Sequence, residues 1–561
     1  MRALLRLLAT AALAATLAST AFASATINII NLDPAGQGLN DNTPAAPVGG
    51  NPGTTVGQQR LNCFNHVAGL WGALLTSAVP INIQGSFAPL SCNATQAVLG
   101  SAGPITVSAN NPSFEFQGYW YHQALANKEA GVDVDPANND INAQFNSNLG
   151  QPTCLAGSGW YYGFDHNEGA LIDLVDVLLH EFGHGLGFST TTSGTTGNFL
   201  GPAPGLPAVW DRFLEDEPSG LRWDAMTPSQ RVASAINTNH LVWDGNEVNN
   251  AAPPFLSHAP EVAVPFAPGT LAANASSFGA ALTLGGVSGQ AVVVNDGVGT
   301  TSDACEAVVG SLAGKIAVID RGTCTFVVKV KNAQNAGAAG AIVVNNGAGA
   351  LAPGGSDPTI TIPSVGITQA DGATLKSAIA GGPTNVTLRL SPTQQAGLSA
   401  VGHVLMFAPN PFQGGSSVSH WDVSATPNLL MEPAINSDLN DSVDLTLPLF
   451  KDIGWLTRTA GVPPSQGPPA RVTLASRPNP TRGPSSVLHF DLASDETLEL
   501  TLYDLSGRQV RSLAKGAFGA GPHEVGWNGL DNAGRPVASG VYMVRLKGVH
   551  TLATQHIVLM N

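Results

Sequence analysis

Residues 171–189 of this 561-residue chain read LIDLVDVLLHEFGHGLGFS, and this segment limits the possible folds most strongly. Its leucines recur with helical spacing, at Leu171, Leu174, Leu178 and Leu179. On such a helix His180 and His184 lie four positions apart, so both imidazoles project from one face. Two ring nitrogens on one face can reach the same zinc ion at about 2.0–2.1 Å. The segment therefore predicts a buried helix over Leu171–Leu186 that carries two metal ligands.

Glu181 follows the first histidine and points to the side of this face. A carboxylate there is placed to take the proton of a water held at the metal, rather than to bind the metal itself. Gly183, Gly185 and Gly187 are poor helix formers, each costing about 1 kcal/mol relative to Ala. Their density predicts close packing, with Gly187 in a sharp turn that ends the helix. The competing interpretation is a helix that carries two histidines without a metal.

A catalytic zinc site needs a third protein ligand and one open position. The segment resembles the metzincin metallopeptidases, whose HExxHxxGxxH pattern matches Gly187 but has Thr190 at the third histidine here. In the leishmanolysin-like branch an insertion separates the glycine from the last histidine. Three later segments resemble that branch: VSHWD at 418–422, LLMEP at 429–433 and LFKDIGW at 449–455.

That resemblance implies His420 as the third zinc ligand and Met431 as a packing residue in a Met-turn under the metal. The competing candidates are loop or surface histidines, with His240 the strongest rival: His166, His240, His258 and His403.

His184 and His420 are 236 positions apart, so a whole domain has to fit between them. The stretch 314–346 predicts a strand (Ile316–Ile319), a helix (Phe326–Ala336) and a second strand (Ala341–Val344). It resembles the protease-associated (PA) domain over about residues 265–395. The resemblance includes a pair formed by Cys305 and Cys324, and implies a non-catalytic lid or contact surface.

The C-terminal part begins after a Pro-rich spacer, GVPPSQGPPA at 461–470. Residues 471–561 alternate short strands with turns and predict a small β-sandwich. They resemble the Ig-like domain related to the flagellar hook-capping protein, and some secretion-sorting domains. This implies a bacterial source and a contact with secretion machinery; a plain spacer domain is the alternative.

The N-terminus and the composition indicate export. Arg2 and Arg6 precede the apolar run Leu7–Leu17 and an A-x-A end, which predicts a signal peptide over 1–25 rather than a membrane anchor. No later segment is apolar enough to span a membrane. A formal net charge of −15 argues against a nucleic-acid partner. Five cysteines fit an oxidising compartment, with the pairing of Cys63, Cys92 and Cys154 left open.

One more cluster offers oxygen ligands for Ca²⁺, although its spacing is not that of an EF-hand and a solvated turn is the alternative. Its members are Asp133, Asp135, Asn138, Asn139 and Asp140.

The predicted fold class is an α+β metzincin-like catalytic domain with an inserted α/β PA domain and a C-terminal β-sandwich. The predicted organisation is a signal peptide (1–25), a metallopeptidase domain in two parts (26–264 and 396–457) around the PA domain (265–395), a linker (458–470) and an Ig-like domain (471–561).

The predicted function is that of a secreted zinc endopeptidase acting on proteins or peptides, with His180, His184 and His420 on the metal and Glu181 as general base. The alternatives are a non-catalytic adhesion or surface protein on a peptidase scaffold, and another peptidase type. No G-x-S-x-G nucleophile motif lies on a plausible strand–helix turn.

Overall fold

The computed structural model describes two stretches of the chain. The first comprises residues 24–347, 349, 351–436 and 439–456. The second comprises residues 475–477, 481–482, 486–492, 496–503, 509–519, 521–532, 534–538, 540–548 and 552–560. The signal peptide, except for its last two residues, and the Pro-rich linker lie outside the described residues. Among the described residues no helix has the length and apolar character needed to cross a membrane.

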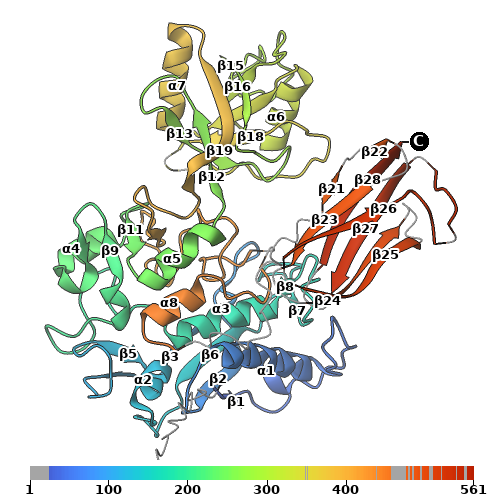
Figure 1. Cartoon of the computed structure of the whole chain (residues 1–561). Helices are drawn as coiled ribbons and strands as arrows, with labels where there is room; N and C mark the ends of the chain where they lie inside the picture. Colours follow the sequence, from blue (N-terminus) through green and yellow to red (C-terminus); the bar gives the residue numbers. More distant parts are fainter. Residues whose placement is uncertain are drawn as a thin grey trace, which may run out of the picture.

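A four-stranded sheet in the order β1-β2-β6-β3 supports the N-terminal half (Figure 1). Its strands are β1 (Ile27–Asn31), β2 (Ile81–Ala88), β6 (Ile141–Asn146) and β3 (Gly100–Pro104). Strands β1, β2 and β6 are parallel, whereas β3 runs antiparallel to β6 and forms an edge of the sheet. Along β2 buried residues alternate with half-buried ones, as expected for a strand with one covered face.

Helices pack on the buried face of this four-stranded sheet. They are α1 (Val56–Leu74) and α3 (Leu174–Leu186), with α2 (Gln123–Ala130) following the short pair β4 (Val107–Ala109) and β5 (Trp120–His122). The ring of Phe64 in α1 lies 5.1 Å from that of Phe145 in β6 and 5.9 Å from that of Phe182 in α3. Offset and edge-on aromatic contacts of this kind stabilise a core beyond the area they bury. The sheet and α1 thus fix the position of α3.

The rest of the main body, which we define as residues 24–257 and 396–456, closes on α3 from the other side. It contains a second sheet in the order β10-β9-β11-β20 and three α-helices. These elements are β9 (Leu214–Asp216), β10 (Leu221–Arg222), β11 (Leu241–Trp243), β20 (Val404–Leu405), α4 (Pro228–Ser234), α5 (Asn246–Phe255) and α8 (Thr446–Asp452), with the small pair β7 (Trp160–Tyr161) and β8 (Ile172–Asp173) before α3. Trp455, just after α8, donates a hydrogen bond from Nε1 to the Leu186 carbonyl at 2.9 Å. The end of the returning segment is therefore anchored on the end of α3.

The inserted domain, His258–Gln395, has one sheet in the order β13-β12-β19-β15-β16-β17-β18-β14. Its elements are β12 (His258–Ala263), β13 (Thr270–Ala272), β14 (Asn274–Ala275), β15 (Val287–Val293), β16 (Ile316–Asp320), α6 (Phe326–Asn335), β17 (Gly340–Val344), β18 (Ser364–Ile367), α7 (Gln369–Gly381) and β19 (Asn385–Gln395). Strands β15 to β18 are parallel. In β16, Ile316 and Val318 share a core with Leu375 of α7, whereas the alternate residues share a core with Val330 of α6. Helices on both faces explain why these strands read as continuous apolar runs.

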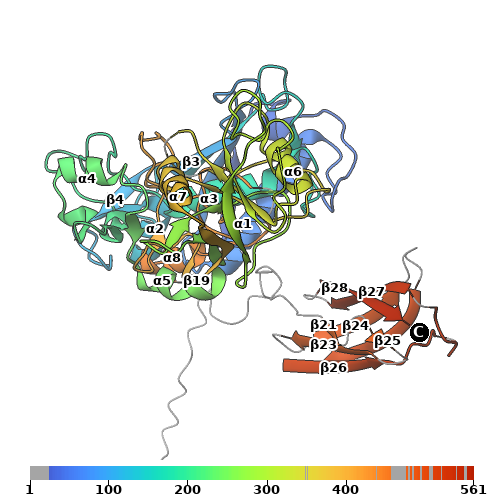
Figure 2. The same cartoon turned by 90° about the horizontal axis from the view of Figure 1, so that it is seen from above.

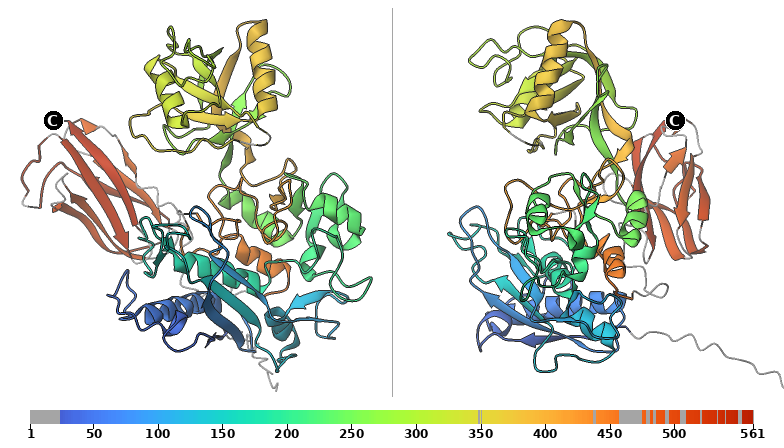
Figure 3. Two further views of the ribbon diagram at one scale, coloured as in Figure 1. Left: turned by 180° about the vertical axis from the view of Figure 1, so that it is seen from behind. Right: turned by 90° about the vertical axis from the view of Figure 1, so that its left-hand side faces the viewer.

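The two ends of the inserted domain lie side by side. His258 at the start of β12 pairs with Gln395 at the end of β19. The sheet therefore begins seven residues before the boundary of 265 that the sequence predicts. Because residues 258–264 alternate poorly between apolar and polar side chains, the sequence pattern did not mark them as a strand. Figures 1 and 3 show the domain projecting from the main body and joined to it at β12 and β19.

This connection makes the inserted domain removable. Replacing residues 259–394 by a short Gly/Ser linker is expected to leave the predicted zinc binding and the predicted cleavage of short peptides unchanged, because the domain has its own cores and the linker joins paired residues. Cleavage of a folded protein substrate should change if the domain acts as a lid or docking surface. Kinetics on both substrates provide the measurement; a folded variant that has lost its zinc would contradict the expectation.

The C-terminal region contains two sheets, in the orders β21-β23-β26 and β22-β28-β27-β24-β25. Its strands are β21 (Ala475–Arg477), β22 (Thr481–Arg482), β23 (Ser486–Leu492), β24 (Glu496–Tyr503), β25 (Gln509–Phe518), β26 (Gly521–Trp527), β27 (Gly540–Gly548) and β28 (Leu552–Met560). Leu488 of β23 and Leu500 of β24 belong to one core that both sheets share. Figure 2 shows the sheets as two layers. This is the arrangement of a β-sandwich.

Two disulfides occur among the described residues. Cys305 and Cys324 are bonded in the inserted domain, and Cys92 is bonded to Cys154 in the main body. Cys63 is a buried free thiol, and burial raises its pKa. The structure thus resolves the pairing that the sequence left open.

Candidate metal centre

Helix α3 begins and ends at residues suited to those positions. The Asp173 side chain accepts a hydrogen bond from the Val175 amide at 2.8 Å, which is an N-cap. The helix begins at Leu174, three residues later than predicted, because residues 172–173 pair with β7. It ends at Gly187, whose φ of 135° suits a residue without a Cβ atom. Every residue between these ends is buried, which rigidly orients the side chains of the helix.

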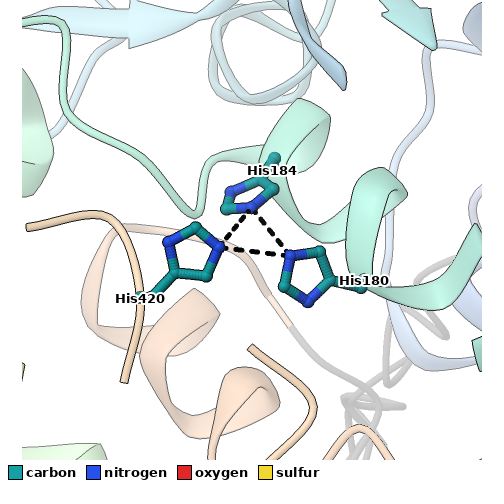
Figure 4. Close-up of side chains that lie close together, drawn as sticks. All are labelled: His180, His184 and His420. Carbon is teal, nitrogen blue, oxygen red and sulfur yellow. Dashed lines mark hydrogen bonds between the residues drawn. The ribbon is translucent and has the colours of Figure 1, made fainter. Parts of the chain in front are cut away.

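The structure brings His180, His184 and His420 together (Figure 4). The Nε2 atoms of His180 and His184 lie 3.1 Å apart, those of His184 and His420 3.2 Å apart, and those of His420 and His180 3.3 Å apart. Ligand atoms at the corners of a tetrahedron, each about 2.0–2.1 Å from one zinc ion, are about 3.3–3.4 Å from one another. The triangle of nitrogen atoms therefore has the size of a tetrahedral zinc site.

Hydrogen bonds on the far side of each ring fix its tautomer. The Nδ1 atoms of His180, His184 and His420 lie 2.7, 2.8 and 2.8 Å from the backbone carbonyls of Leu430, Phe188 and Ser416. A carbonyl only accepts hydrogen bonds, so each Nδ1 carries the proton and each Nε2 presents a lone pair. Orientation of a ligating histidine by a backbone carbonyl is common around metals.

Burial keeps these rings neutral. It lowers the pKa of His180 to about 4 and that of His420 to about 3, and it lowers the pKa of His184 well below its ordinary value. Three neutral rings whose lone pairs converge cannot satisfy one another by hydrogen bonds. A cation between the three Nε2 atoms satisfies all of them, so the residues present fit a zinc ion.

Glu181 follows the first of these histidines in α3, and its side chain faces strand β3. Burial raises the pKa of its carboxyl to about 8, which the Ala102 amide partly offsets by a hydrogen bond to the carboxylate. A Cβ atom at Gly100 would lie 2.9 Å from Glu181 Oε1, so only glycine leaves this carboxyl its place. A carboxyl whose pKa is held near neutrality is suited to general acid–base chemistry.

Met431, which the sequence predicts to lie in a Met-turn, packs against α3. Met431 is fully buried, and a Cβ atom at Gly183 would be 2.8 Å from its sulfur. Its carbonyl accepts a hydrogen bond from the Trp421 amide at 2.9 Å, next to His420. Met431 therefore packs against the helix and helps to place the third histidine.

None of the other candidate histidines lies close enough to His180, His184 and His420 to share a metal ion with them. His240 is exposed, His258 begins β12 of the inserted domain, and His403 lies near a carboxylate at 3.6 Å. His166 belongs to a separate cluster. Thr190, at the position where the short metzincin pattern has its third histidine, donates a hydrogen bond to Asp211 Oδ1 at 2.6 Å and so stabilises the loop after α3.

The acidic turn at 133–140 is held by hydrogen bonds. Asp140 accepts from the Asn82 amide at 2.7 Å and from the Asn127 side chain at 2.8 Å. Asp135 accepts from the Thr106 hydroxyl at 2.7 Å. These oxygens have protein partners, which agrees with the turn interpretation and gives no support for a calcium ion.

Sequence reasoning missed two features near α3. His122 is buried, its Nε2 lies 3.4 Å from the Ser189 hydroxyl, and burial lowers its pKa to about 4. His166 lies with Asp173 and Asp176 at the start of α3. His122 ends β5, 58 positions before His180, and nothing in its spacing connects it to the HExxH segment. His166 is only 14 positions before His180, but it lies in a loop, whose local pattern does not show which side chains the ring meets.

The density of glycines in α3 is explained by close packing, and this can be tested. A Cβ atom at Gly185 would lie 2.4 Å from Ile141 Cγ2, so Gly185→Ala is expected to lower the free energy of unfolding by about 1–3 kcal/mol. The matched control is Gly69→Ala, at an exposed position of α1, where a Cβ atom would have no neighbour within 4 Å. This substitution should raise the free energy of unfolding by about 0.5–1 kcal/mol. Calorimetry of the main-body transition measures both; equal effects would contradict the packing argument.

Comparisons with known proteins identify two accessory domains. A family profile described as "PA domain" matches residues 287–375, and one described as "FlgD Ig-like domain" matches residues 482–551. Leucine aminopeptidase 2 of Arthroderma otae is 47% identical over 79 residues, which are 14% of this chain and 16% of that protein. The minor extracellular protease Vpr of Bacillus subtilis is 37% identical over 86 residues, 15% of this chain and 10% of Vpr.

Among solved structures, the aminopeptidase from Aneurinibacillus sp. strain AM-1 is 27% identical with a TM-score of 0.20, covering 24% of this chain and 30% of that one. The chain thus spans less than a third of each of these proteins, and their names describe them alone. What the comparisons show of this chain is that it contains a PA domain and a FlgD Ig-like domain.

Proposed function

We propose that the chain is an exported zinc endopeptidase of the metzincin type, resembling the leishmanolysin-like branch, in which His180, His184 and His420 hold the metal. The observation that carries this proposal is the convergence of three neutral Nε2 lone pairs, two of them from a helix that also carries the buried carboxyl of Glu181. Structural zinc sites are closed by four protein ligands, whereas catalytic sites have three and an open position. Three histidines with an adjacent Glu match the catalytic type.

The chain's own residues account for the proton transfers. A zinc ion in this place supplies a Lewis acid that polarises the scissile carbonyl and makes a water molecule acidic near neutral pH. Glu181 accepts the proton of the attacking water and delivers it to the leaving amine. The Ala102 amide hydrogen-bonds to the Glu181 carboxylate and so orients this group. His180 and His184 stay in one tautomer because their Nδ1 protons are engaged by backbone carbonyls.

Strand β3 supports endopeptidase rather than aminopeptidase activity. It is an edge of its sheet, and the Ala102 amide on its unpaired side reaches Glu181. An extended peptide can add to such an edge through its backbone, with no need for a free amino terminus. An internal peptide bond can therefore be brought to Glu181, and protein or peptide chains are the proposed substrates.

Export fits the two disulfides, which persist in oxidising compartments. The FlgD Ig-like domain is proposed to contact secretion machinery or a cell surface, and a bacterial source agrees with it. The second candidate function is a non-catalytic adhesion or surface protein on a peptidase scaffold. The intact Glu181 speaks against it, because loss of this carboxylate would be the simplest route to an inactive scaffold.

A peptide blocked at both ends and an aminoacyl chromogenic substrate separate these functions. The zinc-loaded chain is expected to cleave the blocked peptide internally, to stop when a chelator removes the metal, and to resume when zinc is restored. Cleavage of the aminoacyl substrate alone would replace the endopeptidase by an aminopeptidase. If neither substrate is cleaved, the result would favour the second candidate function, that of a non-catalytic adhesion or surface protein.

A further inference from the structure

A second group of potential ligands lies at the other end of α3. His166 Nδ1 is 3.1 Å from Asp173 Oδ2 and 3.6 Å from Asp176 Oδ1. Asp173 is the N-cap of the helix, Asp176 lies in its first turn, and His166 comes from the preceding loop with a left-handed φ of 49°. This region offers one nitrogen and two carboxylate oxygens, all within 4.8 Å of one another.

These atoms are buried without hydrogen bonds of regular geometry. Asp173 is 3% exposed and Asp176 is 4% exposed. Asp173 Oδ2, Asp176 Oδ1 and His166 Nδ1 make no hydrogen bond of regular geometry among the described residues, although Asp173 Oδ2 and His166 Nδ1 are at ion-pair distance, 3.1 Å. An unsatisfied buried polar atom costs about 1–3 kcal/mol, and more when it is charged. Three such atoms that point at one another indicate a ligand between them.

A carboxylate behind the histidine orients the ring. His166 Nε2 lies 3.3 Å from Asp441 Oδ1, and Asp441 Oδ2 lies 3.8 Å from His66 Nε2. His66 is itself held by stacking on Phe164, with ring centroids 4.5 Å apart. When Asp441 accepts the Nε2 proton, Nδ1 is left with its lone pair towards Asp173 and Asp176. A carboxylate–histidine–metal chain of this kind is a common outer shell of zinc ligands.

Three carboxylates lie around His166. Asp173, Asp176 and Asp441 each have an oxygen within 3.6 Å of a nitrogen of the His166 ring. A divalent ion would neutralise the two facing carboxylates. One imidazole with two carboxylates suits zinc or a similar transition metal, because Ca²⁺ takes oxygen ligands.

We infer that His166, Asp173 and Asp176 form a second metal site, which binds a zinc-class divalent ion at the N-terminal end of α3. Its role is to tie the loop before β8 to the start of α3. The inference is independent of the proposed peptidase activity, because it concerns metal content and not turnover.

Metal counting by mass spectrometry on the full chain, stripped by chelator and dialysed against Zn²⁺, tests the site. The unaltered chain should bind two equivalents, and Asp176→Asn and His166→Gln should each bind one. The matched control Glu168→Gln removes a charge from the same loop and should keep two. His420→Ala should also bind one equivalent, and adding Asp176→Asn to it should remove that one.

Asp441→Asn distinguishes an orienting role from a ligand, because it should keep two equivalents and weaken the second about 10–100-fold. One equivalent in the unaltered chain, with no change in Asp176→Asn or His166→Gln, would overturn the inference. The cluster would then be an ion pair, in which the Asp173 and Asp441 carboxylates raise the pKa of His166 to about 10. A His166 imidazole that still titrates near that value in zinc-saturated protein would overturn it as well.

Discussion

Glu181→Gln is expected to abolish peptide cleavage and to leave the zinc at the histidine triangle in place. Glutamine keeps the shape of the side chain and its contact with β3, but it cannot accept a proton. General acid–base catalysis contributes about 10²–10⁴-fold, so kcat should fall by at least that factor. Turnover of the blocked peptide and metal content are measured on the same preparation.

The metal content serves as the control for folding, because the three Nε2 atoms assemble only in the folded main body. Full activity in a zinc-loaded Glu181→Gln variant would contradict the proposed role of this carboxylate. Loss of zinc together with activity would show that Glu181 is needed for the site's structure.

His420→Ala is expected to remove the zinc from the triangle, whereas His240→Ala should leave it bound. Two histidines on one helix cannot complete a three-ligand site. The affinity should fall by more than the roughly 10–100-fold that loss of an outer-shell partner costs. His240 is exposed and lies outside the metal-binding group, which makes it the matched histidine control.

Equilibrium dialysis at limiting zinc measures this affinity, and calorimetry in chelator checks that both variants fold. A His420→Ala chain that binds zinc at the triangle as tightly as the unaltered protein would contradict the ligand assignment. Loss of this zinc in His240→Ala would show that His240, and not His420, is the third ligand.

Local patterns predicted α3 and the inserted helix well. The helix predicted over Phe326–Ala336 occurs as α6 at Phe326–Asn335, and the predicted strands on either side of it match β16 and β17. The two strands are short apolar runs bounded by turn residues, so the local sequence determines their structure. The start of α3 was predicted three residues too early, because Ile172 and Asp173 form strand β8, which pairs with β7.

Contacts distant in sequence were harder to predict. His420 was identified through a family resemblance, because nothing in its local spacing connects it to a helix 236 positions earlier. Bonding of Cys92 to Cys154 depends on how β2 and β6 bring their following loops together, which periodicity does not reveal. His166 read as an ordinary loop histidine, since its partners Asp173 and Asp441 meet it only in the folded chain.

An anomalous difference map at the zinc absorption edge, from crystals of the zinc-loaded chain, tests the central claim most directly. The account predicts a peak about 2.0–2.1 Å from the Nε2 atoms of His180, His184 and His420, with Glu181 beside it and not bound to it. A fully loaded crystal with no peak inside this triangle, or with a peak that His420 does not touch, would contradict the account.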